Sequence, residues 1–127
     1  MKILVIGKNG QLGLSINKSV ESYSHNHKFT FAGRSDINLS KKNNIYNYFK
    51  DQNFDVIINC AAYTAVDKAE TELKEADLIN NKAVEFIAEI ANQMKSILIH
   101  ISTDYVFDGK KNNTYNEIDQ TNPINVY

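Results

Sequence analysis

The chain of 127 residues suits one domain with a core of ordinary size. Its 43% hydrophobic and 23% charged residues are typical of a globular protein and exclude a disordered one. The net charge of −1 argues against a nucleic-acid partner, and no apolar run is long enough to span a membrane.

The N-terminal segment combines a short apolar strand, expected over 2–6, with three regularly spaced glycines. In a dinucleotide-binding turn of this G-x-x-G-x-x-G spacing, Gly7 permits the sharp bend and Gly10 lets a pyrophosphate approach the main chain. Gly13 lets the following helix, expected over 10–22, pack close to the sheet. The N–H groups at the start of that helix attract the anion. An ordinary strand-to-helix turn is the alternative, but this position between a strand and a helix favours dinucleotide binding.

The rest of the chain alternates between helical and strand patterns. The first helix offers Leu12, Leu14, Ile16 and Val20 for an inner face. A polar loop with two histidines, His25 and His27, is expected over 22–27; no other metal-ligand cluster accompanies them, so no metal site is predicted. Further strands are expected over 29–32, 55–60 and 96–101, with helices over 42–52 and 68–94, the latter breaking near 77–81, before a polar segment over 103–127.

These elements predict an α/β fold with a doubly wound, Rossmann-like parallel sheet of about four strands in the order 3-2-1-4. The third strand, an unbroken apolar run, is typical of a strand covered on both faces. The fourth strand is expected to present an open apolar edge, which favours aggregation. Cys60, the single cysteine, is expected to be a buried apolar residue; it excludes an internal disulfide and favours a cytoplasmic protein.

Ligands of such sheets bind beyond the carboxyl ends of the strands, where four polar or glycine-containing segments converge. After the second strand, Arg34 suits the 2′-phosphate of NADPH, whereas the nearby Asp36 suits the ribose of NADH; a plain surface arginine is the third alternative. After the third strand, Ala61 and Ala62 offer small side chains beside a flat ring or a ribose, or simply pack at the start of a helix. After the fourth strand, Ser102, Thr103 and Asp104 offer hydroxyls and a carboxylate to a substrate, or simply cap a helix or turn.

Four segments, GKNGQLG, VIINCAAYTAVDKAE, ISTDYVFDG and NPINVY, together resemble the N-terminal half of the dTDP-4-dehydrorhamnose reductases, which are extended short-chain dehydrogenases/reductases. The resemblance covers the whole chain. It implies one truncated dinucleotide-binding domain over 1–127, without the sugar-binding lobe. The implied substrate is a nucleotide sugar, dTDP-4-dehydro-L-rhamnose, with no nucleic-acid or membrane partner; Mg²⁺ and a homodimer follow by family analogy alone.

The resemblance also implies a role for individual residues. Those expected to hold the coenzyme, NADPH or NADH, comprise the glycine-turn residues Gly7, Gly10, Gln11, Leu12 and Gly13, then Arg34, Asn38 and Leu39, then Ala62, Tyr63 and Thr64. Asn38 replaces the aspartate that the family commonly has there. Those expected to meet the sugar are Thr103, Asp104, Val66 and Tyr105.

Tyr127 falls on the tyrosine of the family's Y-x-x-x-K motif. The implied reaction is hydride transfer to the C4 ketone of the sugar, with Tyr127 as general acid and Thr103 steadying the forming alkoxide. The motif lysine would lie beyond the printed residues, and a terminal carboxylate on Tyr127 would oppose its ionisation; we expect the chain alone to be inactive. A second Y-x-x-x-K, from Tyr46 to Lys50, is expected to be structural.

Two other functions stay open at this point. A chain with a nucleotide fold and no motif lysine could be a non-catalytic regulatory subunit, like that of methionine adenosyltransferase. The same fold and tyrosine also serve nucleotide-sugar epimerases and dehydratases.

Overall fold

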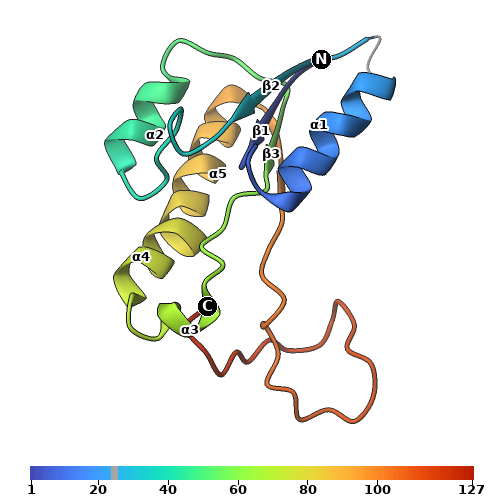
Figure 1. Ribbon diagram of the computed structural model, residues 1–127, viewed down its shortest axis with the longest axis vertical. Coiled ribbons are helices and arrows are strands. Elements are labelled where there is room, and N and C mark those ends of the chain that lie inside the picture. Colours follow the sequence, from blue (N-terminus) through green and yellow to red (C-terminus); the bar gives the residue numbers. More distant parts are fainter. Residues whose placement is uncertain (24–25) are drawn as a thin grey trace.

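The computed structural model describes residues 1–23 and 26–127 as a four-stranded parallel sheet with helices on both faces (Figure 1). Parts of the predicted 22–27 loop, His25 among them, therefore lie outside the described residues. The strands are β1 (Lys2–Ile6), β2 (Lys28–Ala32), β3 (Val56–Asn59) and β4 (Ile97–His100). The helices are α1 (Gln11–Tyr23), α2 (Lys42–Phe49), α3 (Val66–Ala69), α4 (Leu73–Asp77), the π-helix η1 (Leu78–Lys82) and α5 (Ala83–Met94). The predicted alternation of strands and helices is confirmed.

The strand order is β2-β1-β3-β4, so the predicted order 3-2-1-4 is wrong. Residues 33–41 form turns rather than an extra strand beyond β2, and the connection through α2 returns across β1 to its other edge. The apolar pattern of β3 fits this central place, because strands buried on both faces lack polar alternation. The less buried β2 lies at the edge instead.

The other edge is formed by β4, as predicted. Ile97 and Ile99 are 62% and 45% exposed there. This edge presents unpaired main-chain groups together with apolar side chains.

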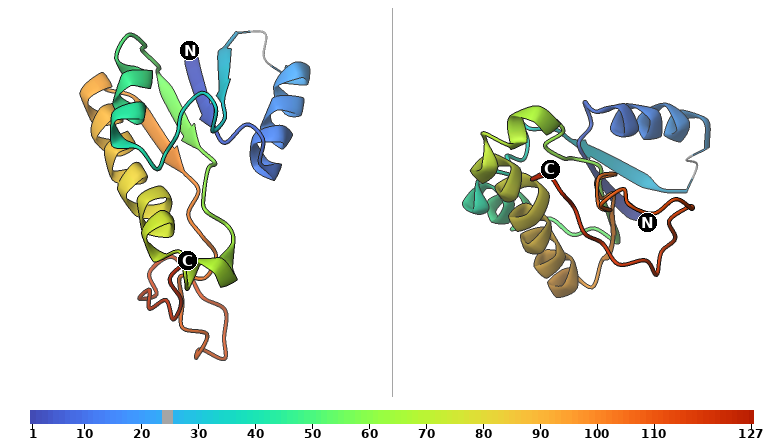
Figure 2. Two further views of the ribbon diagram at one scale, coloured as in Figure 1. Left: turned by 60° about the vertical axis from the view of Figure 1, so that its left-hand side comes forward. Right: turned by 90° about the horizontal axis from the view of Figure 1, so that it is seen from below.

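Two layers of helices cover the sheet unequally. Figure 2 shows α1 on one face and α2 and α5 on the other. The face under α2 and α5 holds the larger core, in which Leu4, Ile45, Ile57 and Ile87 are fully buried. Burial of each such side chain stabilises the fold by about 1.5–3 kcal/mol.

The opposite face is less well covered than the sequence suggested. Leu12 and Leu14 of α1 are 41% and 48% exposed, whereas Ile16 and Val20 are half-buried. Only the latter two therefore contribute to the predicted inner face. Among the described residues, α1 lies alone on its side of the sheet, so no neighbouring helix packs against its flank.

The predicted break near 77–81 in the long third helix is also wrong. The helix is interrupted at 70–72, between α3 and α4, whereas 78–82 is a π-turn that joins α4 to α5 without a break. A π-turn inserts one residue into the helix and often marks a functional site. The helix ends at Lys95, whose left-handed backbone (φ 56°) is a standard helix stop.

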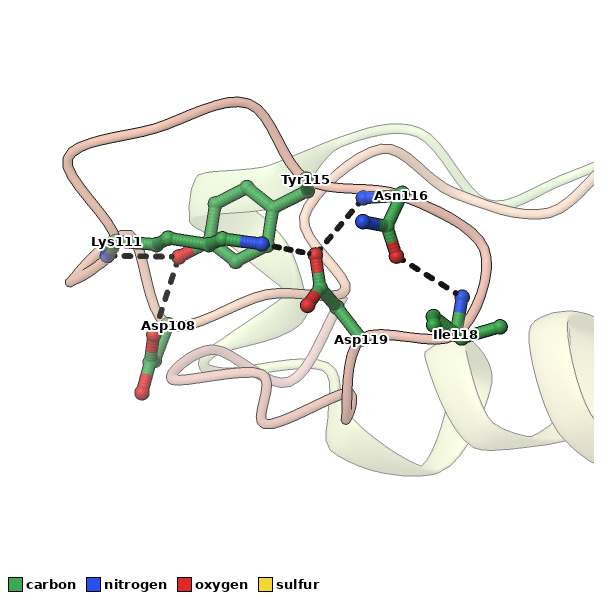
Figure 3. A network of polar contacts seen from close by, with 6 residues as sticks. All are labelled: Asp108, Lys111, Tyr115, Asn116, Ile118 and Asp119. Atoms are coloured by element: carbon green, nitrogen blue, oxygen red, sulfur yellow. Dashed lines mark hydrogen bonds and ion pairs between the residues drawn. The ribbon is translucent and has the colours of Figure 1, made fainter.

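The last segment, 101–127, has no helix or strand, but polar contacts hold it in a defined path (Figure 3). The ring of Tyr115 stacks on Phe107 with centroids 4.1 Å apart, and its hydroxyl donates to Asp108 at 3.3 Å. Asp119 accepts hydrogen bonds from the Lys111 ammonium and, at 2.8 Å, from the Asn116 main chain. These side-chain contacts hold the segment in place, because it has no helix or strand whose main-chain hydrogen bonds could do so.

Candidate coenzyme and substrate site

The bend after β1 requires glycine at position 7. Gly7 has a φ of 94°, a conformation that other residues rarely adopt. A Cβ there would lie 2.8 Å from the Ala61 nitrogen, so the turn and the end of β3 approach each other without side chains between them. The Gly7 and Lys8 N–H groups both donate to the Ala32 carbonyl, at 2.8 and 3.1 Å. The predicted sharp bend is confirmed.

The other two glycines differ in what surrounds them. A Cβ on Gly13 would lie 2.3 Å from the Gly7 carbonyl oxygen, so Gly13 lets α1 pack directly on the turn. A Cβ on Gly10 would meet only that same oxygen, at an ordinary 3.4 Å. The Gly10 N–H donates to Gly7 within the turn. In the described part of the chain, the N–H groups of Gln11 and Leu12 have no main-chain acceptor, which leaves them for an anion.

A cavity of about 950 Å³ lies at the carboxyl ends of the strands. It brings together ten of the eleven residues predicted to hold the coenzyme; Gly13 is excluded because it is packed beneath the turn. Sequence reasoning missed seven further lining residues. The ten are Gly7, Gly10, Gln11, Leu12, Arg34, Asn38, Leu39, Ala62, Tyr63 and Thr64. Ala61, expected beside Ala62, also lines the cavity, and the seven that were missed are Ile6, Asn9, Gly33, Ile37, Cys60, Ala65 and Ile79.

Two basic side chains lie near the end of β2: Arg34 lines this cavity, and Lys8 packs against Gly33, which also lines it. Lys8 forms an ion pair with Asp36 at 2.6 Å, and the same Asp36 oxygen accepts the Gly33 N–H at 2.8 Å. These contacts, the Gly33 N–H first and Lys8 second, lower the pKa of Asp36. Arg34 is 77% exposed and lies 3.5 Å from Glu75 of α4. Asp36 is thus engaged by protein groups, and Lys8, which sequence reasoning overlooked, is a second cation at this end of β2.

Asn38 and Leu39 hold the adjoining wall of the cavity. The Asn38 side-chain oxygen accepts hydrogen bonds from the N–H and hydroxyl of Ser40, at 3.1 and 2.9 Å. Leu39 is buried at 7% exposure. Asn38 therefore shapes the turn, and the side chain of Leu39 anchors it in the core.

The loop after β3 is clamped by a side chain from the π-turn. The side-chain oxygen Oδ1 of Asn80 accepts a hydrogen bond from the Tyr63 main-chain N–H at 2.7 Å. The side-chain nitrogen Nδ2 of Asn80 donates to the Tyr63 main-chain carbonyl at 3.0 Å. The Tyr63 hydroxyl donates to Glu72, which raises the pKa of Tyr63 to about 12. The only sequence signal near Asn80 was the irregularity expected at 77–81, which coincides with the π-turn but does not indicate the contact with Tyr63.

A second, smaller cavity of about 90 Å³ adjoins the first. Thr103 and Tyr127, the two predicted catalytic residues, line it together with Ala62, which also lines the larger cavity. The predicted sugar contacts Asp104, Val66 and Tyr105 do not line either cavity. Ser102, expected with Thr103 after the fourth strand, also lines it, whereas Asn80, His100 and Ile101 were not predicted.

Tyr127 packs against Tyr105 with ring centroids 6.1 Å apart. The adjacent Val126 N–H donates to Glu70 at 3.0 Å, which ties this part of the chain to the end of α3. The pKa of Tyr127 is raised, the predicted direction, but by burial first and then by Asp104 and Tyr105 rather than by a terminal carboxylate. The phenol is therefore protonated at neutral pH, as a proton donor requires.

The second tyrosine motif lies away from both cavities. The Tyr46 hydroxyl donates to Glu89 at 2.7 Å, and its ring contacts Phe86 of α5. The structural role predicted for Tyr46 follows from these contacts. Across residues 1–23 and 26–127, no group of three acidic, histidine or cysteine side chains is placed to hold a metal ion, and no helix has the length and apolarity needed to cross a membrane.

Comparison with known proteins places this geometry in a family. The chain matches the family described as RmlD substrate binding domain over residues 1–127. A dTDP-4-dehydrorhamnose reductase from Sinorhizobium fredii is 40% identical over 127 residues, which cover all of this chain and 42% of that protein. The chain thus spans less than half the length of this curated relative.

Solved structures agree with this assignment. A dTDP-4-dehydrorhamnose reductase from Clostridium acetobutylicum superposes with a TM-score of 0.93 at 36% identity, over 100% of this chain and 45% of that one. The reductase from Bacillus anthracis in complex with NADP gives 0.88 at 30% identity, over 99% and 45%. A UDP-Glc/GlcNAc 4-epimerase from Campylobacter jejuni gives 0.84 at 19% identity and shares the fold alone. The Rossmann-like fold is confirmed, and the chain belongs to the RmlD substrate binding domain family.

Proposed function

We propose that the chain is the dinucleotide-binding domain of an NADPH-dependent reductase that converts dTDP-4-dehydro-L-rhamnose to dTDP-L-rhamnose. One observation carries the proposal: Ala62 lines both the cavity above the glycine turn and the small cavity that contains Thr103 and Tyr127. A coenzyme ring beside Ala62 would therefore lie next to a hydroxyl pair suited to a substrate carbonyl. The identity of 36–40% to reductases favours reduction over epimerisation.

The residues present fit a dinucleotide. The main chain at Gly10 is unobstructed, and the free N–H groups of Gln11 and Leu12 suit a diphosphate. The cavity of about 950 Å³ is large enough for a ligand of this size. When bound, NADPH supplies the hydride of the reaction.

The charges near β2 favour NADPH over NADH. A 2′-phosphate requires cations, which Lys8 and Arg34 provide, whereas a free ribose hydroxyl requires an acidic acceptor. Asp36 is the candidate acceptor, but it is held by Lys8 and the Gly33 N–H. The Bacillus anthracis relative, solved in complex with NADP, is consistent with this preference.

Tyr127 and Thr103 would complete the reaction in the small cavity. The raised pKa of Tyr127 keeps its proton on the phenol, from which it passes to the oxygen of the reduced ketone. The Thr103 hydroxyl donates a hydrogen bond to the same oxygen and stabilises its developing charge. Asn80 fixes the loop that separates the two cavities through its two bonds to Tyr63.

The coenzyme preference is tested by titrating the chain with NADPH and NADH in a calorimeter. We expect Lys8→Ala to weaken NADPH binding about tenfold, the loss of one charged contact, and to leave NADH binding unchanged or slightly stronger, because Asp36 loses one of its two partners. Lys82→Ala is the matched control, since Lys82 also pairs with a carboxylate, Glu85 at 3.2 Å, but belongs to η1, whereas Lys8 packs against Gly33 of the large cavity. Equal losses for both coenzymes in Lys8→Ala would contradict the assignment of the 2′-phosphate to this cluster.

A further inference from the structure

A polar pair, buried Asn59 and half-buried His100, joins the carboxyl ends of β3 and β4 and has no role in the reaction described above. Asn59 is 1% exposed and is the register partner of His100 across the two strands. Its side-chain oxygen accepts the Ala61 N–H at 3.1 Å, and its Nδ2 lies 3.2 Å from Nδ1 of His100. A buried polar group at such a position has a specific partner because leaving it unpaired is costly.

These two contacts favour one tautomer of the imidazole. The Ala61 N–H can only donate, so the oxygen of the Asn59 amide faces Ala61 and its NH₂ group faces His100. An NH₂ group also can only donate, so Nδ1 of His100 must be the unprotonated acceptor. The proton of the neutral ring is therefore on Nε2.

The surroundings of His100 favour this neutral form. Burial lowers the pKa of His100, and the main-chain carbonyl of Asn59 acts weakly in the opposite direction. Protonation would also place an N–H of the ring against the amide NH₂ of Asn59 and break their hydrogen bond. The ring is held neutral and in one tautomer.

The free nitrogen of this ring is available to a ligand. His100 lines the small cavity with Thr103 and Tyr127. In the described part of the chain, Nε2 has no hydrogen-bond partner and is not among the buried unpaired atoms.

We propose that His100, held in one tautomer by Asn59, donates its Nε2–H to an oxygen of the sugar bound in the small cavity. The ligand class is a sugar carrying hydroxyl or carbonyl oxygens, and this assignment rests on the proposed function. His100 is thereby a substrate-binding residue, and Asn59 is a positioning residue that acts through it.

The tautomer is tested by nitrogen NMR of the ¹⁵N-labelled chain at pH 7, with the His100 signals assigned by their loss in His100→Gln. We expect an unprotonated Nδ1 and a protonated Nε2. In Asn59→Asp, the carboxylate accepts rather than donates, so Nδ1 becomes protonated. A protonated Nδ1 in the unaltered chain would overturn the proposal.

Ligand contact is tested with dTDP-L-rhamnose, added to the chain saturated with NADP⁺. We expect the Nε2 signal to shift on binding, and His100→Phe to weaken binding about fivefold, as the loss of one neutral hydrogen bond predicts. His100→Gln keeps an amide donor and should bind within about twofold of the original chain, since the hydrogen bond is retained. His27→Phe, an exposed histidine outside the cavities, is the control and should have no effect.

The outcomes separate this inference from the proposed function. Unchanged binding in His100→Phe, or no shift of Nε2 at saturating sugar nucleotide, overturns the role of His100 while coenzyme binding stands. Failure of NADPH and NADH to bind the folded chain overturns the proposed function itself.

Discussion

Individual glycines have separable roles in the turn after β1. Gly7 and Gly13 are required by the protein itself, because a Cβ at either position would overlap main-chain atoms at 2.8 and 2.3 Å. Gly10 has room for a Cβ, with its nearest neighbour at 3.4 Å, and faces the large cavity. The structure thus assigns two of the glycines to folding and leaves one for the ligand.

This division predicts different results for two alanine variants. Gly13→Ala should lower the free energy of unfolding by about 1–3 kcal/mol, because the added methyl group forces the turn apart. Gly10→Ala should keep its stability within about 0.5 kcal/mol but weaken NADPH binding at least about tenfold, because the methyl group occupies the approach to the main chain. Urea unfolding and calorimetry measure the two quantities. A Gly10→Ala chain that binds NADPH normally would show that the diphosphate does not approach this turn.

At the scale of elements, the π-turn η1 and the loop after β3 form one unit. Asn80 satisfies both main-chain groups of Tyr63, and the loop in turn supplies the wall between the two cavities. A regular helix through 78–82 would rotate the following side chains relative to those before the turn. The extra residue of the π-turn therefore helps to place Asn80 over the loop after β3.

The clamp predicts a strong effect of an isosteric change. Asn80→Asp replaces the amide donor with an acceptor, so the Tyr63 carbonyl loses its partner and faces a negative charge. We expect a loss of about 1–3 kcal/mol in stability and weaker NADPH binding, because the loop is no longer held. Asn81→Asp, on the same turn but bonded only to the exposed Asp77, is the matched control. Thermal unfolding and NADPH titration should separate the two variants; equal behaviour would mean that the clamp contributes nothing.

The local elements were predictable from the sequence, but their arrangement was not. Apolar runs and turn residues placed β1 to β4 within one or two residues, because these signals depend on neighbouring positions. The strand order was wrong because the familiar order assumes a strand between β2 and α2, where this chain forms only turns. The unbroken apolar run of β3 was the available sign of its central place.

In the candidate site too, the local segments were predictable from the sequence, whereas the contacts between distant segments were not. The glycine turn and the segments after each strand are contiguous in sequence, and the structure gathers ten of their predicted residues in one cavity. Asn80, Lys8 and the Asn59–His100 pair act through contacts between distant segments. Spacing along the chain carries no information about such contacts.

At the scale of the whole molecule, the sheet has an exposed apolar edge at β4. The edge strand β4 exposes Ile97 and Ile99, and α1 leaves Leu14 half-exposed on the same sheet. The regulatory-subunit hypothesis and the predicted homodimer both require a partner surface and remain predictions. The exposed edge of β4 is expected to promote self-association of the chain, which can be measured.

We expect Ile97→Lys with Ile99→Lys to reduce concentration-dependent association of the chain, because charges on an open edge disfavour strand pairing. Light scattering over a concentration series measures the effect. Ile118→Lys is the control, since Ile118 is 93% exposed but lies outside the strand. Equal suppression by the control would assign the association to general surface hydrophobicity rather than to the edge.

The most direct test of the account is a calorimetric titration of the folded 127-residue chain with NADPH. The account predicts saturable binding of one NADPH per chain, tighter than NADH, and lost in Gly10→Ala although that variant stays folded. Absence of binding heat with both coenzymes, in a chain shown to be folded by its unfolding transition, would contradict it.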